Sequence, residues 1–250
     1  MDTNVADQVR GWLERSGLNA ATVARRAGVA PSTLHRITNG LVDPSVGTIR
    51  EIALGCGVDL SLVTHAPSDG RAACAARTML EEGYSPPSDG EVGEWISRLA
   101  RLAQGDGPVE IVETAARYSS PLFRPGAVWF EGSPTLGRVA SAGDASGAEW
   151  AISGAPGLYL PDPLEESPAV TVLWCRRIVA TSQLLRGAGV RPTNCAEKTS
   201  VIVVEGEPEI FQGSFRLGLV RFVAPIQVII DCLSLGGAVA QDARDEASTW

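Results

Sequence analysis

The sequence predicts a mainly helical domain over residues 1–66, followed by a C-terminal domain of α/β or α+β type. In the first part, apolar residues recur at helical spacing between capping residues and glycines. After Pro121, short runs rich in β-branched residues alternate with helical stretches, which is typical of a mixed domain. Between the two parts, the segment HAPSDG at residues 65–70 has the composition of a linker.

The composition is that of a globular protein with a core of ordinary size. The chain has 250 residues, of which 44% are hydrophobic and 20% charged. Its five cysteines are scattered and form no C-x-x-C pair, so we expect free, mostly buried thiols. With only two histidines we expect no metal site and no cofactor. The absence of a signal-peptide pattern and of a run of roughly 18–20 apolar residues predicts a cytoplasmic protein with no membrane contact.

The net charge of −8 is unevenly distributed along the chain. Residues 1–66 contain six arginines and six acidic residues, so the whole negative charge lies in residues 67–250. This distribution argues against a protein that coats nucleic acid along its length. Any nucleic-acid binding by the neutral segment would need its arginines on one face, together with dimerisation.

Four helices are predicted in the first domain, each bounded by capping residues. They cover residues 5–16, 20–28 and 31–39 and a stretch that opens at 43–45. Asn19 is placed to cap the second helix, Pro31 occupies the first turn of the third, and Gly28 and Gly40 follow as stops. Leu34 and Ile37 are expected to face inward. The core should be closed by Val58, Leu60, Leu62 and Val63.

Residues 67–120 are predicted to form a helical connector or a second helical subdomain, with a winged helix as one form of the latter. Residues 121–250 are predicted to form an α/β regulatory or antitoxin-like domain. The expected helices cover residues 72–82, 91–104, 109–119, 178–188 and 225–235. The expected strands cover residues 169–176, 200–205 and 216–223. Residues 133–147 are predicted as a loop or the start of a flexible helix, and the polar tail QDARDEASTW is expected to fray.

The stretch 18–63 begins with LNAATVARRAGVAPSTLHRITNGLVDPSVGTIREIALGCGV, which is residues 18–58. This line resembles the Xre/Cro-like helix-turn-helix family, whose fold is lambda-repressor-like. The matching positions are Ala24, Gly28, Val29, Asn39, Gly40, Pro44, Ser45, Ile52, Ala53 and Gly57. The resemblance implies that the third helix enters the major groove of double-stranded DNA. It also implies a sequence-specific transcription regulator, which we expect to be a homodimer on a palindromic operator.

The resemblance and the helical spacing give a set of candidate DNA-binding residues. They are Pro31, Ser32, Thr33, His35, Arg36, Asn39, Asn19 and Ser45. Arg36 is the candidate for a bidentate guanine contact, with a phosphate contact as the alternative. Ser32 and Thr33 would reach base edges or phosphates. His35 would donate to a phosphate or be merely exposed, and Asn39 would bind phosphate or only cap the helix.

One departure from the family concerns the second residue of the second helix. The family often has a glutamine there that binds phosphate, whereas this sequence has Ala20. The preceding Asn19 can still cap the helix. We therefore expect modest affinity, or reliance on a dimer.

Residues 150–237 resemble the abortive-infection type IV antitoxin family (AbiEi-like regulators), most specifically in VAPIQVIIDCLSLGG at 223–237. The matched positions are Pro225, Gln227, Asp231, Leu233 and Gly236. This resemblance implies an autoregulator that counters a nucleotidyltransferase-like toxin. Gln227 and Asp231 lie four residues apart on a helix that is apolar on nearly all sides, so we expect both to be buried and bonded to backbone groups of a neighbouring loop.

The sequence favours a regulator over an enzyme. It contains neither a phosphate-binding G-x-x-x-x-G-K-[ST] motif nor a G-x-S-x-G motif, and a nuclease-like set of Glu205, Glu207 and Lys198 has no supporting strand pattern. The main interpretation is a DNA-binding repressor or antitoxin-type autoregulator. One alternative is an interaction module whose acidic second half neutralises a toxin. The other is a ligand-sensing regulator with a closed apolar pocket in residues 121–237.

Overall fold

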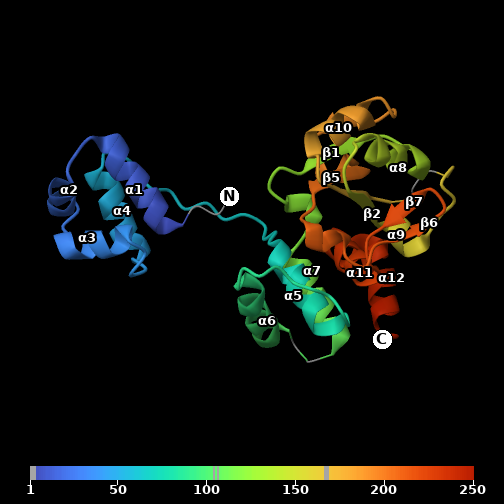
Figure 1. Cartoon of the computed structure of the whole chain (residues 1–250), viewed down its shortest axis with the longest axis horizontal. Coiled ribbons are helices and arrows are strands. Elements are labelled where there is room, and N and C mark those ends of the chain that lie inside the picture. The colour runs from blue at the N-terminus through green and yellow to red at the C-terminus, as the bar shows by residue number, and fades with distance from the viewer. Residues whose placement is uncertain (1–3, 104, 106, 166–168) are drawn as a thin grey trace. The chain divides into compact units, whose positions relative to one another are not determined.

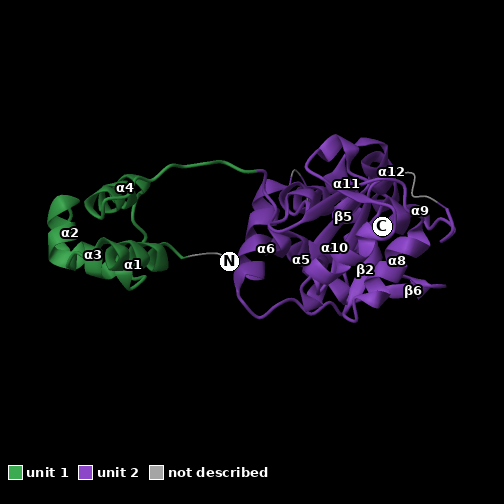
Figure 2. Cartoon of the chain, turned by 90° about the horizontal axis from the view of Figure 1, so that it is seen from above, with its two compact units in different colours: residues 1–65 green, residues 66–250 purple. Residues whose placement is uncertain are grey.

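The computed structural model describes residues 4–103, 105, 107–165 and 169–250. It divides into two compact units, residues 1–65 (unit 1) and residues 66–250 (unit 2), shown in Figure 2. Residues 1–3 of the first predicted domain, residue 104 of the predicted helix 91–104, and residues 106 and 166–168 lie outside the described residues. No helix in the described parts is long and apolar enough to cross a membrane.

Unit 1 consists of four helices, as the sequence predicts. They are α1 (Val5–Ser16), α2 (Ala20–Arg26), α3 (Pro31–Thr38) and α4 (Val46–Gly55) (Figure 1). The core contains only apolar residues, with Val9, Val23 and Ile52 fully buried at its centre. Four short helices therefore share a single small hydrophobic core, and no charged side chain is buried in it among the described residues.

The prediction that four apolar residues after α4 close this core is mostly wrong. Leu60 packs against the core, but Val58, Leu62 and Val63 are exposed. The reason is that the chain beyond Gly57 forms no helix before unit 2, so these residues face no apolar surface.

Unit 2 is built on a mixed seven-stranded sheet with the order β4-β1-β5-β3-β2-β7-β6. The strands are β1 (Val128–Glu131), β2 (Trp150–Gly154), β3 (Thr171–Cys175), β4 (Arg191–Thr193), β5 (Val201–Glu205), β6 (Phe215–Leu217) and β7 (Val220–Phe222). The β3–β5 and β2–β7 pairs are parallel and the other pairs antiparallel. The fold class is thus an all-helical unit followed by an α+β unit, as predicted.

Helices cover both faces of the central strands, so these strands are buried on both sides. Side chains alternate between the faces: Val172 and Trp174 belong to one hydrophobic cluster, and Leu173 and Cys175 to the other. On the first face α11 (Pro225–Leu235) contacts β2. The same hydrophobic cluster extends through α5 (Gly70–Leu80), α6 (Glu91–Leu102), α7 (Pro108–Tyr118) and α12 (Gly237–Ala247). The second face packs against α8 (Leu136–Ala145) and α10 (Ile178–Arg186).

The helices of residues 67–120 share the first of these clusters with the sheet. Residues 66–250 consequently form one compact unit, in which α5 and α7 pack against α11 and α6 packs against α5 and α7. The predicted linker HAPSDG contains the boundary between the two units, and residues 65–67 have no regular structure. Its last part belongs to unit 2, because Asp69 caps α5 and its amide donates to the Tyr118 carbonyl at 2.7 Å.

Several local predictions in unit 2 need correction. The predicted loop or flexible start at 133–147 is the regular helix α8. The run 216–223 is a hairpin of β6 and β7 that turns at Gly218, where φ is +58°. The C-terminal tail forms α12 instead of fraying, because Val239, Ala243 and Ala247 recur every four residues and pack into the core. Strands β1, β2 and β4, the short helix α9 (Ala155–Tyr159) and the 3₁₀ turns at 121–123, 196–198 and 208–211 were not predicted.

The polar pair on α11, Gln227 and Asp231, is buried as expected, but the partners of Asp231 differ from those predicted. Asp231 is fully buried and accepts hydrogen bonds from the Trp174 indole at 2.8 Å and the Gln227 amide at 2.9 Å. Side chains, rather than loop backbone, therefore satisfy the carboxylate. Burial raises the pKa of Asp231, although its hydrogen bonds and the positive charge of Arg124 act in the opposite direction.

Candidate nucleic-acid interface

The helix α3 separates its residues cleanly into a core face and an outer face. Leu34 and Ile37 are each only 1% exposed, as the sequence predicts. The outer face is made of exposed residues: Pro31, Ser32, Thr33, His35, Arg36 and Asn39. Because the two apolar anchors hold the helix in the core of unit 1, the outer side chains form a surface on a rigid element.

The corner between α2 and α3 depends on Gly28. This residue has a φ of +65°, a conformation that side chains with a Cβ adopt only at a cost. Its amide donates to the Arg25 carbonyl at 3.3 Å, and the amide of Val29 donates to the Ala24 carbonyl at 3.0 Å. These two bonds form a Schellman motif that ends α2 and reverses the chain into α3.

The same motif ends α3 and α4. Gly40 and Gly57 both have positive φ, and the residue after each glycine bonds back across the last helical turn. The glycines at 28, 40 and 57 are thus explained by one backbone geometry. This explanation is independent of any family resemblance.

The close approach of α4 to α2 was not predicted. A Cβ at Gly55 would lie 3.2 Å from the Val23 carbonyl oxygen and 3.4 Å from the Ala27 Cβ. Gly55 therefore allows α4 to pack tightly behind α2. The sequence pattern showed a glycine near a helix end, but not that another helix passes so near to it.

Two of the candidate residues serve as helix caps. Asn19 accepts a hydrogen bond from the Thr22 amide at 2.8 Å, and Ser45 accepts one from the Thr48 amide at 3.2 Å. Both are exposed at the first turns of α2 and α4. Their side-chain oxygens are occupied locally, which accounts for these residue types whether or not they also contact DNA.

Asn39 and His35 interact with each other at the end of α3. The Asn39 amide donates to the His35 carbonyl at 2.7 Å, so Asn39 caps the C-terminal end of the helix. The first turn of α3 is different, because Ala30 offers no side-chain acceptor. Pro31 has no amide hydrogen and the Thr33 amide donates to the Ala30 carbonyl at 2.9 Å, which leaves the Ser32 amide for an anion such as a phosphate.

The arginines of unit 1 fall into two groups. Arg10 pairs with Asp7 and donates to the Thr38 carbonyl at 2.5 Å, and Arg50 lies 3.6 Å from Asp59. By contrast, Arg15, Arg25, Arg26 and Arg36 are exposed and form no ion pair with any described residue. The link from Arg10 to the end of α3 was missed in the sequence, which gives no indication of contacts between distant helices.

Residues 5–66 match the family model described as a helix-turn-helix domain. The helix-turn-helix domain indicates a DNA-binding regulator. The match covers α1–α4 and thus the whole of the surface described above. Comparison with curated proteins and with solved structures gave no match.

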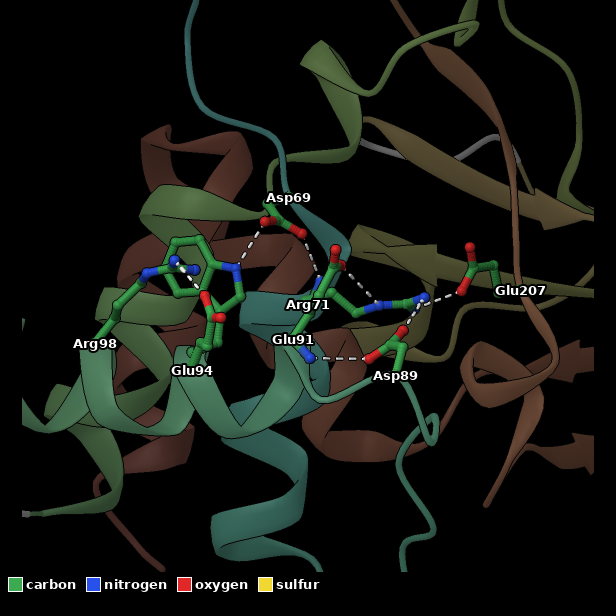
Figure 3. Close-up of polar contacts among 8 residues, drawn as sticks. Asp69, Arg71, Asp89, Glu91, Glu94, Arg98 and Glu207 are labelled. Atoms are coloured by element: carbon green, nitrogen blue, oxygen red, sulfur yellow. Dashed lines mark hydrogen bonds and ion pairs between the residues drawn. The ribbon is translucent and has the colours of Figure 1, made fainter. Parts of the chain in front are cut away.

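In unit 2, some charged side chains pair with one another around α5. Figure 3 shows Arg71 between Asp89, at 2.5 Å, and Glu207, also at 2.5 Å, with Glu91 at 3.7 Å. Arg77 is fully buried and makes a bidentate pair with Glu81 at 2.7 and 3.1 Å. The Arg71 pairs connect α5 to the segments around Asp89 and Glu207, and Arg77 connects it to residues 209–212 through hydrogen bonds to the Glu209 and Gln212 carbonyls. Within the described ranges, no three His, Cys, Asp or Glu side chains are arranged to hold a metal ion.

Proposed function

We propose that this protein is a sequence-specific DNA-binding transcription regulator, of repressor or antitoxin-type autoregulator class, that acts in the cytoplasm without catalysing a reaction. The observation that supports this best is the outer face of α3. It presents two hydroxyls, an imidazole and the unpaired guanidinium of Arg36 on a helix anchored by Leu34 and Ile37. Such a set offers donors to base edges and to phosphates.

In this proposal α3 lies in the major groove, with Ser32, Thr33 and Arg36 toward the bases. Arg25 and Arg26, at the end of α2, supply charge for the DNA backbone. Because unit 1 has no net charge and Ala20 offers no side-chain contact, one copy would bind weakly. The regulator therefore acts as a homodimer on two half-sites about one helical turn apart.

The test is binding of the full-length protein to the DNA upstream of its own gene and to unrelated DNA, over a range of salt concentrations. We expect preference for the upstream DNA, two chains per site, and loss of that preference in Arg36→Ala. The matched control is Arg186→Ala, which removes an exposed arginine from α10 and should bind like the wild type. Failure of the wild type to bind either DNA at low salt would contradict the proposal.

The antitoxin-type alternative is supported by the acidity of unit 2 and by the resemblance in residues 223–237. Here unit 2 would neutralise a nucleotidyltransferase-like toxin. This role predicts that a neighbouring gene encodes such an enzyme and that the two proteins co-purify. Growth inhibition by the enzyme should then be relieved by the Arg36→Ala variant as well as by the wild type, because this substitution leaves unit 2 unchanged.

A further inference from the structure

An open cavity of about 350 Å³ lies in unit 2, between α7, α11 and α12. Its size falls in the range of small-molecule sites. It is not the closed apolar pocket within 121–237 that a ligand-sensing regulator was expected to have, because residues of α7, α12 and the entry segment 66–67 help to line it. The residues used below are Pro67, Arg117, Ser120, Phe123, Leu233 and Arg244.

The polar side of this cavity is cationic although unit 2 as a whole is acidic. Arg244 is paired with Glu113, which also lines the cavity. Arg117 is exposed and has no hydrogen-bond or ion-pair partner among the described residues. One guanidinium charge is therefore left over at this site, where it can bind an anion.

A second observation concerns Ser120. Its side chain is only 5% exposed, and its hydroxyl has no hydrogen-bond partner within the described structure. A buried hydroxyl without a partner costs free energy. Since Ser120 lines the cavity, rotation about its Cα–Cβ bond can turn the hydroxyl toward a ligand, which would recover this cost.

Part of the cavity lining is apolar. Phe123 and Leu233 belong to it, and Phe123 is about half exposed, so part of its ring is open to a ligand. We propose that this cavity binds a small organic acid, with its anionic group on Arg117 and its apolar body against Phe123 and Leu233.

The position of the cavity indicates that this ligand acts as an effector. Pro67 lines it, and the adjacent Ser68 and Asp69 are fixed to residues 118–120 by backbone and side-chain hydrogen bonds. A ligand in the cavity therefore contacts the segment through which the chain enters unit 2 from unit 1. This role as an effector site rests on the proposed function, whereas the ligand site itself does not.

The test uses 4-fluorobenzoate as the probe and its neutral analogue 4-fluorobenzamide, with binding followed by ¹⁹F NMR line broadening on the full-length protein. We expect the benzoate to bind at up to millimolar concentration and the benzamide to bind about 10-fold more weakly, because it lacks the charge-assisted bond. Arg117→Gln should weaken benzoate binding by a similar factor, and Ala240→Leu should block both probes by filling the cavity. Arg186→Gln should match the wild type.

Equal binding of the two probes, unchanged binding in Arg117→Gln, or no binding of the benzoate at millimolar concentration would overturn the proposal. Arg117 is exposed and unpaired, so its replacement does not threaten the fold. Because the measurement contains no DNA, its failure is distinguishable from failure of the DNA-binding proposal.

Discussion

The two units differ in where they place their charged residues. In unit 1 the core is apolar throughout, and Arg25, Arg26 and Arg36 lie unpaired on the surface. In unit 2, Arg77 and Asp231 are fully buried, and Arg71 is surrounded by carboxylates. An unpaired surface charge is available to a ligand, whereas a buried, paired charge fixes neighbouring elements in place. Unit 1 therefore keeps its charged groups on the surface, whereas unit 2 also buries some of them within its fold.

The largest effect should come from removing a buried charge of unit 2. Asp231→Ala leaves the Trp174 and Gln227 donors without an acceptor, and we expect a loss of about 3–5 kcal/mol in the free energy of unfolding of unit 2. The matched control is Asp245→Ala, at an exposed position of α12, with a change of at most about 0.5 kcal/mol. Denaturant unfolding measures both. A loss below about 1 kcal/mol for Asp231→Ala would show that this network does not stabilise unit 2.

The same carboxylate gives a pH dependence with a defined sign. The pKa of Asp231 is raised by burial, so the folded state binds the proton more tightly than the unfolded state. The free energy of unfolding should therefore fall as pH rises from the ordinary pKa of an aspartate through the raised pKa. Asp231→Asn does not titrate, so its deficit relative to the wild type should shrink over this range. A deficit independent of pH would contradict the assignment.

A core substitution in unit 1 tests whether the two units are independent. Leu34→Ala removes a buried side chain and should cost unit 1 about 2–5 kcal/mol, which abolishes DNA binding. Amide hydrogen exchange should accelerate in α1–α4 and remain slow in β3 and β5. The reciprocal control is Leu173→Ala, which should accelerate exchange in unit 2 only. Faster exchange in both units after either substitution would mean that they unfold together.

A smaller effect tests the corner before α3. Gly28→Ala forces an alanine into positive φ and should destabilise unit 1 by roughly 1–2 kcal/mol. Gly47→Ala is the control, because the nearest atom to its new Cβ is 3.8 Å away and its φ is not positive. It should be neutral or stabilise unit 1 by up to about 1 kcal/mol. Equal effects of the two substitutions in thermal unfolding would show that the left-handed geometry at Gly28 is unimportant.

The two units also differ in how much of their structure could be predicted from the sequence alone. The helices of unit 1 were predicted within a residue or two because their determinants are local: Asn19 and Ser45 cap helices, and Gly28 and Gly40 end them. Strand β1 was missed because it has four residues and gains its stability from pairing with β4 and β5, more than 50 residues away. Likewise, no local pattern links Asp231 to Trp174, which lies 57 residues earlier.

For the candidate interface, spacing correctly separated the buried Leu34 and Ile37 from the exposed residues of α3. The contact of Arg10 with the end of α3 and the close approach at Gly55 depend on how helices pack, which spacing within one helix does not contain. Which exposed residues contact DNA stays a prediction.

The central claim is that α3 recognises the base sequence, and it is tested most directly by measuring binding to operator variants with each base pair substituted in turn. Arg36→Ala should lose about 1–3 kcal/mol of discrimination between base pairs at one position of each half-site. Arg25→Ala should instead weaken binding to all operator variants equally and lower the slope of log affinity against log salt concentration by about one. A uniform loss for Arg36→Ala, with discrimination unchanged at every position, would contradict base recognition by Arg36 on this helix.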